Sequence, residues 1–403
     1  MTLALARPGR LTIALLAGFA ALAPMAIDMY LPALPAISAA MRAAPAQATA
    51  TLSLFFTGLA LGQLLVGPLS DRIGRRPPLV GGLMLFIVGT LAAAAAGSIG
   101  QLIAARLAQG IGGAAVTVSG RAIVRDMFDH RGTARFLSML MLISGLAPVL
   151  APSLGSALLA AGSWRGIFLF TGAVGALFLV GTLVALPETR GIEARRTARR
   201  DHPLRTYIRL LGNRRLTGYL LAAACNSGVF FTYLAAAPLV LMQAYGLKPW
   251  WFSTIMAANA IGLVGSSQIN RWLLKTRMPD HMLRVSARNA ALLAISFLAF
   301  AGTLAGGLPV LLLLVFAAVA SNSVVQANTM AGALSVDPAQ SGSTAALFGA
   351  TGFGAGTLCS LVAGLLFDGT PRGMAAMIGI GLIGTATALR FMAVPAAADE
   401  DDE

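Results

Sequence analysis

Apolar stretches of about 20 residues recur along the whole chain, and short polar links separate them. Each stretch is long enough to cross the hydrocarbon core of a bilayer, about 30 Å thick, as an α-helix. The stretches are continuously apolar and lack the alternation of barrel strands, so helices are favoured over a β-barrel. We predict twelve spans, with ends uncertain by a few residues, at residues 12–33, 48–70, 79–97, 100–122, 135–160, 163–186, 217–243, 251–274, 284–305, 309–332, 343–366 and 374–394.

The longest polar stretch, PETRGIEARRTARRDHPLRTYIRLLGNRR, divides these spans into two groups of six. This division predicts four parts: an N-terminal bundle at 1–187, a basic linker at 188–216, a C-terminal bundle at 217–395 and an acidic tail at 396–403. Within the linker, the pattern LRTYIRLL indicates an amphipathic helix lying on the membrane surface. The links GPLSDRIGRRP and GSSQINRWLLKTRMP follow the second span of each group, and such weak repetition is typical of repeat-built transporters.

The positive charges predict how the chain is oriented. Of the 29 Lys and Arg residues, 24 fall on one side when successive links are assigned to alternate sides. Four fall on the other side, Arg42, Arg165, Lys248 and Arg372, and Arg106 lies inside a span. Because cytoplasmic loops carry the excess of Lys and Arg, both termini are expected in the cytoplasm. Arg7 and Arg10 before LTIALLAGFAALA resemble the start of a signal peptide, but no small-x-small cleavage site follows, so a retained first helix is favoured.

The composition excludes several classes of protein. The chain is 57% hydrophobic and 11% charged, which is too little charge to cover a soluble domain of 403 residues. Its net charge of +14 lies in the links, so nucleic-acid binding is not expected. The two cysteines fall in apolar runs and the three histidines have no metal-ligand spacing, so neither a disulfide, a metal nor a cofactor is predicted. Without paired carboxylates or a phosphate-binding Gly loop with Lys, a membrane enzyme or an ATP-driven protein is disfavoured.

The link after the second span, GPLSDRIGRRPP, is the strongest motif. Gly67 is expected to allow close helix approach and Gly74 a tight turn, and Pro77 and Pro78 suit the first turn of the next helix. A generic basic turn would account for the arginines but not for the whole combination. The residues of this link on the predicted cytoplasmic side are Gly67, Asp71, Arg72, Gly74, Arg75 and Arg76, and Asp126 lies near the same end of span four.

Two further motifs lie inside spans. Arg106 begins RLAQGIGGAA in span four, and a buried arginine is costly unless it faces a partner or a water-filled cavity. Snorkelling to the nearby outer interface is the alternative. Span five carries SGLAPVLAPSLGS, in which Pro148 and Pro152 open the backbone ladder and Gly145 and Gly155 admit a neighbouring helix.

The stretch APMAIDMYLPALP in span one holds the only clearly intramembrane carboxylate, Asp28. Burial away from water favours the protonated form of a carboxyl group, whereas a nearby arginine favours the ionised form. Asp28 is therefore the candidate proton carrier, with Arg106 expected within its reach. Pro32 and Pro35 are interpreted as the outer end of this helix.

These motifs, in register, resemble the major facilitator superfamily, and DMYLPALP resembles the signature of its Bcr/CflA drug-resistance branch. The resemblance implies an all-α membrane protein of twelve transmembrane helices in two pseudo-symmetric six-helix bundles. It implies that Asp71, Arg75 and Asp126 form a cytoplasmic latch and that Arg106, with Gln109 and the following glycines, takes part in proton coupling. The Gly-Pro motif of span five resembles the antiporter motif, although Ala147 and Ala151 precede the prolines where glycine is usual.

The function expected from this resemblance is proton-coupled efflux of small drugs such as bicyclomycin- or chloramphenicol-like compounds. The partners are then drugs, protons and the bilayer of a bacterial inner membrane, with the proton gradient as the energy source and the monomer as the working unit. The alternative is a transporter of one metabolite, such as a sugar or an amino acid. Candidate pocket residues, each of which could instead pack or face lipid, are Met25, Met29, Tyr30, Gln109, Asn226, Phe230, Tyr233, Asn322 and Gln326.

Overall fold

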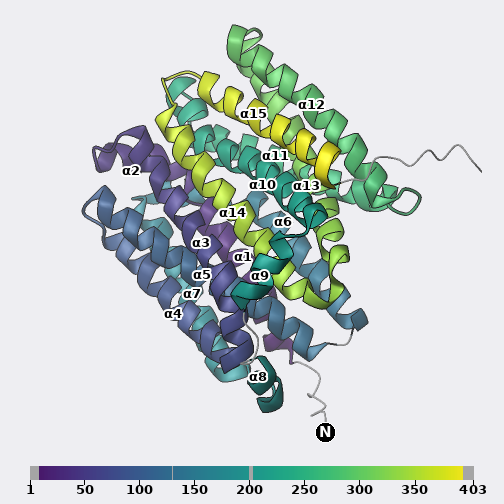
Figure 1. Cartoon of the computed structure of the whole chain (residues 1–403). Helices are drawn as coiled ribbons and strands as arrows, with labels where there is room; N and C mark the ends of the chain where they lie inside the picture. The colour runs from purple at the N-terminus through teal and green to yellow at the C-terminus, as the bar shows by residue number, and fades with distance from the viewer. Residues whose placement is uncertain (1–8, 129, 199–202, 394–403) are drawn as a thin grey trace, which may run out of the picture. The chain divides into compact units, whose positions relative to one another are not determined.

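The computed structural model describes residues 9–128, 130–198 and 203–393. These residues are helical almost throughout, and no β-strand occurs among them, which confirms the predicted all-α class. Figure 1 shows the long helices and the short links between them. The predicted acidic tail at 396–403 lies outside the described residues.

Ten helical segments of the described chain are long and apolar enough to cross a membrane. They are α1 (Arg10–Asp28) continued by η1 (Leu31–Ala33) and α2 (Leu34–Ala40), α3 (Pro45–Ile73), α4 (Arg76–Ala95), α5 (Ile99–Met127), α7 (Arg165–Ala185), α10 (Arg214–Ala237) continued by η2 (Pro238–Ala244), α12 (Pro279–Thr303), α13 (Gly307–Val336), α14 (Ser341–Leu365), and α15 (Arg372–Ala388) continued by η4 (Leu389–Ala393). Two further long helices, α6 (His130–Ala161) and α11 (Pro249–Leu273), occupy the remaining predicted spans.

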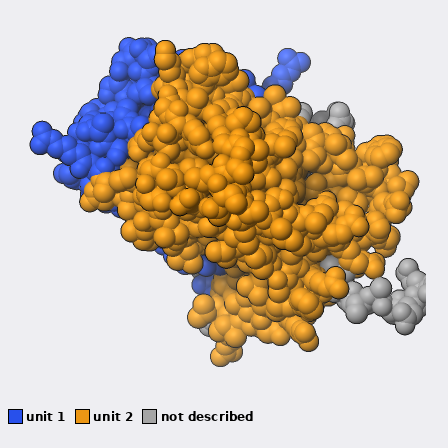
Figure 2. Space-filling model, turned by 90° about the horizontal axis from the view of Figure 1, so that it is seen from above, with its two compact units in different colours: residues 1–43, 54–202 blue, residues 44–53, 203–403 orange. Residues whose placement is uncertain are grey.

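The chain forms two compact units, which Figure 2 colours separately. Unit 1 contains residues 1–43 and 54–202, and unit 2 contains residues 44–53 and 203–403. The boundary between the units falls within α3, whose residues up to Ser53 belong to unit 2 and whose later residues belong to unit 1. Within unit 2, the hydroxyl groups of Ser53 and Ser360 are hydrogen-bonded at 2.7 Å.

In unit 1, glycines let the backbones of α3, α4 and α5 come close together. A Cβ atom on Gly110 of α5 would meet the carbonyl oxygen of Phe55 on α3, and one on Gly112 would meet backbone atoms of Gly82 and Phe86 on α4 at 2.5–2.8 Å. Small residues are the usual means by which membrane helices approach each other. This close packing fixes the face of α5 that carries Arg106.

In unit 2, α10 packs against α13, α14 and α15 and supplies much of the buried core. Two buried asparagines join α10 to α13 reciprocally: the amide of Asn226 donates to the carbonyl of Asn322 at 3.2 Å, and the amide of Asn322 donates to the carbonyl of Asn226 at 3.0 Å. Polar side chains commonly link helices in this way inside a membrane.

The basic linker contains two short helices, α8 (Ile192–Ala198) and α9 (Pro203–Leu211). Helix α9 coincides with the predicted amphipathic segment. Only two connecting residues, Gly212 and Asn213, separate it from α10.

The predicted end of the first span at Pro32 and Pro35 is wrong. The chain passes through a short 3₁₀ turn at Leu31–Ala33 and continues as helix to Ala40. The first turn of a helix tolerates proline, because the backbone N–H groups of that turn have no partner within the helix. Pro32 and Pro35 both occupy such positions, so they mark a break within the span rather than its end.

Candidate functional site

Asp28 lies at the break in the first span. It is the last residue of α1 and is only 4% exposed. Beyond it the hydrogen bonding tightens, because the N–H of Tyr30 donates to the carbonyl of Ile27, three residues back, at 3.2 Å. The carboxylate is therefore held where the helix changes from α to 3₁₀ geometry.

Arg106 of α5 is completely buried and reaches this same break. Its Nη1 donates to the main-chain carbonyl of Ala26 at 3.1 Å, two residues before Asp28. The guanidinium carbon lies 4.7 Å from the ring centre of Tyr30 and 4.2 Å from that of Phe55, with Phe168 at 6.0 Å. An arginine stacked on aromatic faces gains cation–π attraction, which is strongest where water is excluded.

A polar chain continues from Arg106 towards α4. The Nη1 of Arg106 also donates to Oε1 of Gln109 at 2.5 Å, and the amide of Gln109 donates to the hydroxyl of Thr90 at 2.8 Å. Thr90 in turn donates to the carbonyl of Phe86 at 2.6 Å. Gln109 is thus fully engaged as a connector between Arg106 and α4.

Arg106 was expected within reach of Asp28, and it reaches the Asp28 segment without forming an ion pair in the described structure. Within the described residues no ion pair joins them, and Nε and Nη2 of Arg106 have no hydrogen-bond partner there. Arg106 approaches the Asp28 segment through the backbone of α1 instead. Snorkelling to the outer interface is also wrong for Arg106, since its side chain is enclosed by aromatic rings and has no exposed surface.

The motif of span five meets the other side of the break. A Cβ atom on Gly155 of α6 would lie within 3 Å of the carbonyl group and Cα of Met29, the residue after Asp28. Pro148 and Pro152 both lie inside α6, as expected for residues that interrupt its ladder. Gly145 also lies in α6, at a position whose surroundings fall outside the described part of the structure.

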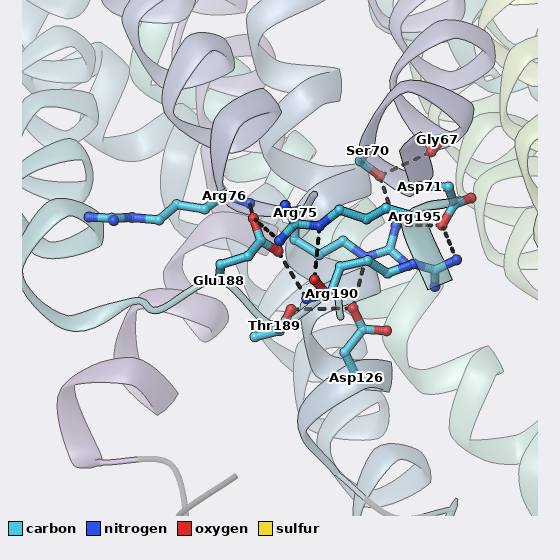
Figure 3. Close-up of polar contacts among 10 residues, drawn as sticks. All are labelled: Gly67, Ser70, Asp71, Arg75, Arg76, Asp126, Glu188, Thr189, Arg190 and Arg195. Carbon is cyan, nitrogen blue, oxygen red and sulfur yellow. Dashed lines mark hydrogen bonds and ion pairs between the residues drawn. The ribbon is translucent and has the colours of Figure 1, made fainter. Parts of the chain in front are cut away.

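A second cluster lies in the link between α3 and α4 (Figure 3). Arg75 is the centre: its Nη1 is 2.7 Å from Asp71, and its Nε donates to Asp126 of α5 at 2.8 Å. Burial by itself would lower the pKa of Arg75, but the hydrogen bonds and charges of Asp126 and Asp71 outweigh it and raise that pKa above its usual value. The guanidinium therefore stays charged at any physiological pH.

Glu188, which the sequence analysis did not single out, holds the start of α4. Its carboxylate accepts the backbone N–H of Arg75 at 2.8 Å and that of Arg76 at 3.2 Å. An anion at a helix N-terminus satisfies free N–H groups and interacts favourably with the helix dipole. It also accepts the N–H of Arg190 at 2.9 Å and lies 3.5 Å from the guanidinium of Arg195.

Three more polar residues belong to this cluster and were also missed. The hydroxyl of Ser70 accepts a bond from Arg75 at 2.9 Å, and the hydroxyl of Thr189 donates to Asp126 at 3.2 Å. The guanidinium of Arg190 lies 3.4 Å from Asp71. The segment PETR after span six was the available signal, because its acid and hydroxyl follow a span directly.

The two glycines of this link behave differently. Gly74 has φ +108°, a conformation that other residues rarely adopt, and a Cβ there would meet the carboxylate of Glu188. Among the described residues a Cβ on Gly67 would meet nothing within 4 Å, so close helix approach at Gly67 stays a prediction; its carbonyl accepts the hydroxyl of Ser70 at 3.0 Å. Arg72 lies in the last turn of α3, and Arg76 donates to the carbonyl of Leu183 at 2.9 Å.

The predicted pocket residues fall into two groups, one in each unit. In unit 1, Met29 and Tyr30 are buried and the ring of Tyr30 lies beside the guanidinium of Arg106, whereas Met25 is half-buried on α1. In unit 2, the hydroxyl of Tyr233 accepts from the amide of Asn259 at 2.7 Å.

Two other candidates in unit 2, Gln326 and Phe230, also contact nearby side chains. Gln326 donates to Ser227 at 2.7 Å, one turn along α13 from Asn322. The Oε1 of Gln326 has no partner in the described chain. Phe230 packs edge-on against Phe231, with ring centres 5.6 Å apart.

Comparison with known proteins identifies the family. A model of the Major Facilitator Superfamily matches residues 16–361. The chain belongs to the Major Facilitator Superfamily. It is 33% identical over 359 residues to the MFS-type transporter YdgK of Bacillus subtilis, covering 88% of this chain and 89% of that one. It is 30% identical over 354 residues to a bicyclomycin resistance protein homolog of Haemophilus influenzae, covering 86% and 87%.

A further relative is the multidrug resistance protein MdtL of Escherichia coli, 34% identical over 237 residues, or 59% of this chain and 60% of that one. Among solved structures, the D-xylose–proton symporter superposes with a TM-score of 0.75 at 15% identity, covering 95% of this chain and 98% of its own. At this identity the likeness shows the fold alone. It supports the twelve-helix major facilitator fold predicted from the sequence.

Proposed function

We propose that this protein is a proton-coupled exporter of small drugs in a bacterial inner membrane. The observation that carries the proposal is the burial of Asp28 at the break in the first span, between the Arg106 contact of α5 and Gly155 of α6. An ionisable residue inside a membrane marks a functional site by default. The names of two relatives, a bicyclomycin resistance protein homolog and a multidrug resistance protein, support drugs as the substrates.

In this proposal Asp28 carries the proton. When ionised, its carboxylate attracts a cationic or polar group in its neighbourhood; when protonated, it loses most of that attraction. Arg106 keeps the segment in position by donating to the carbonyl of Ala26, so a change of charge at Asp28 acts on a backbone that is already interrupted. Gly155 leaves room for this segment against α6. Proton binding and drug binding would then exclude each other through one side chain.

The cluster around Arg75 is proposed as the latch of the transport cycle, on the cytoplasmic side. Its charged contacts occur among residues of three different helices and the segment after α7, so breaking them releases several elements together. The excess of Lys and Arg in alternate links supports this side assignment, and with it cytoplasmic termini. The monomer is proposed as the working unit.

Proteoliposomes with an internal pH-sensitive dye test the central claim. Addition of a phenicol or bicyclomycin to wild-type protein is expected to release protons in proportion to drug movement, and Asp28→Asn is expected to abolish this release. Asp368→Asn, which changes an exposed loop acid, is the matched control and should behave as wild type. Wild-type proton release by Asp28→Asn would overturn the proposal.

The alternative, transport of a single metabolite, is distinguished by substrate range. A resistance panel in an efflux-deficient host should show protection against several unrelated drugs, and a protonophore should remove that protection. Protection against none of them, combined with uptake or export of one sugar or amino acid, would favour the alternative.

A further inference from the structure

Helix α9 presents an apolar stripe that nothing in the described structure covers. Leu204 is 72% exposed, Ile208 65% and Leu211 46%. These residues recur at intervals of four and three, so they lie one above the other on a single face. In water, three such side chains on a nine-residue helix would be an unfavourable surface.

A different face of α9 attaches the helix to the rest of unit 2. Tyr207 and Leu210 are buried, and the helix packs against α10 and α14. Helix α9 is thus attached to unit 2, and the exposed stripe does not belong to a segment that lacks packing contacts. One face of α9 already has its protein partner, and the exposed face points elsewhere.

The connection to α10 keeps α9 at the level of the membrane surface. The hydroxyl of Thr217, in the first turn of α10, donates to the carbonyl of Leu211 at 2.8 Å. The side chain of Asn213 caps α10 by accepting the N–H of Leu216 at 3.1 Å. Since α10 is a candidate membrane span that begins at Arg214, a helix held two residues before it lies beside the head groups.

The charges on α9 indicate what it meets there. Arg205 and Arg209 are exposed and stand one residue beyond Leu204 and Ile208, about 100° around the helix from the stripe. The helix has no acidic residue, and Arg214 and Arg215 follow it after Gly212 and Asn213. Asp337 approaches Arg209 to 4.0 Å, and the side chain of Arg209 is still 65% exposed. An apolar face bordered by arginines is the pattern of a helix that lies in the interface of an anionic membrane.

We propose that α9 is an interfacial helix that binds anionic phospholipid: Leu204, Ile208 and Leu211 insert between the acyl chains, and Arg205 and Arg209 bind the phosphates. The helix then anchors the linker and the start of α10 to the lipid surface. The attraction of α9 to the surface depends on the charge of the lipid, and each arginine raises the local affinity for anionic lipid about fivefold. This role is independent of which substrate the protein carries.

The experiment places a fluorescent probe on the full-length protein. Cys225 and Cys359 are replaced by serine, and single cysteines are introduced as Ile208→Cys on the stripe and Thr206→Cys on another face of the same helix. Each is labelled with bimane and reconstituted in vesicles of phosphatidylcholine and phosphatidylglycerol. Leu358→Cys, on an exposed position of α14 inside the membrane, is the reference for full lipid contact.

The label at 208 is expected to be quenched by lipids brominated in the acyl chain and protected from aqueous iodide, as at 358, whereas the label at 206 shows the weaker lipid quenching. Equal iodide quenching at 206 and 208 would overturn the insertion. Brominated phosphatidylglycerol should quench 208 more than brominated phosphatidylcholine, and Arg205→Gln with Arg209→Gln should abolish the difference. No difference between the two lipids in the parent protein would overturn the anionic preference.

Discussion

Arg106 donates a hydrogen bond to the main-chain carbonyl of Ala26, two residues before the buried carboxylate of Asp28, and forms no ion pair with that carboxylate in the described structure. The link between the two ionisable groups of this region is therefore a backbone contact. It acts where the first span changes from α to 3₁₀ hydrogen bonding.

This relationship predicts additivity between the two positions. Arg106→Met keeps most of the side-chain volume but removes every donor, so it should lower the free energy of unfolding by about 1–3 kcal/mol through the unsatisfied carbonyl. Asp28→Asn should not rescue it, because no charge pair exists to be balanced. Thermal unfolding of both single variants and the double variant measures the coupling, which is expected to stay within about 0.5 kcal/mol. A clear rescue in the double variant would show that the side chains interact directly.

The contact between Gly155 and Met29 predicts a strong effect of a single methyl group. Gly155→Ala places a Cβ against the backbone of Met29, which cannot move aside as a flexible side chain could, and should cost about 1–3 kcal/mol. Drug-driven proton release should fall in the same variant, because the displaced segment carries Asp28. The control is Gly166→Ala in α7, where a Cβ meets nothing within 4 Å. Equal stability of the two variants would contradict the close approach.

The hydrogen bonds of Glu188 predict that the segment after α7 stabilises the start of α4. Glu188→Gln keeps an acceptor for the backbone N–H groups of Arg75 and Arg76 but removes the negative charge at the start of α4. We expect a loss of about 0.5–2 kcal/mol, from the weaker interaction with the helix dipole. Thermal unfolding should show a lower midpoint than in Glu193→Gln, which changes an exposed acid of α8. A midpoint equal to that of Glu193→Gln would show that the charge of Glu188 does not stabilise the start of α4.

The two asparagines that join α10 and α13 predict nearly independent contributions. Each amide donates to the main-chain carbonyl of the other residue, so removing one side chain leaves the other bond in place. Asn226→Ala and Asn322→Ala should each cost about 0.6 kcal/mol, the average for hydrogen bonds between membrane helices. The double variant should lose the sum, measured by unfolding in detergent. A double variant no less stable than either single variant would mean that the two amides act as one unit.

The sequence by itself determined the class of the protein and the approximate place of every span. Continuous apolar runs of membrane length require helices, because a backbone in lipid must satisfy its own hydrogen bonds. The pairing of Asp71 with Arg75 was implied by the family resemblance. The sequence itself located Gly74, since a turn that needs positive φ is a local feature that can be read from the spacing of residues.

The tertiary structure decided which groups meet across the chain. The sequence placed Arg106 and Asp28 in different spans but could not show that aromatic rings of Tyr30 and Phe55 would enclose the guanidinium and direct it to a backbone carbonyl. It also gave no means of pairing Glu188 with the start of α4, more than a hundred residues away in sequence. Such contacts depend on the rotation and depth of packed helices, and these are fixed by glycines and side-chain volumes on several helices at once.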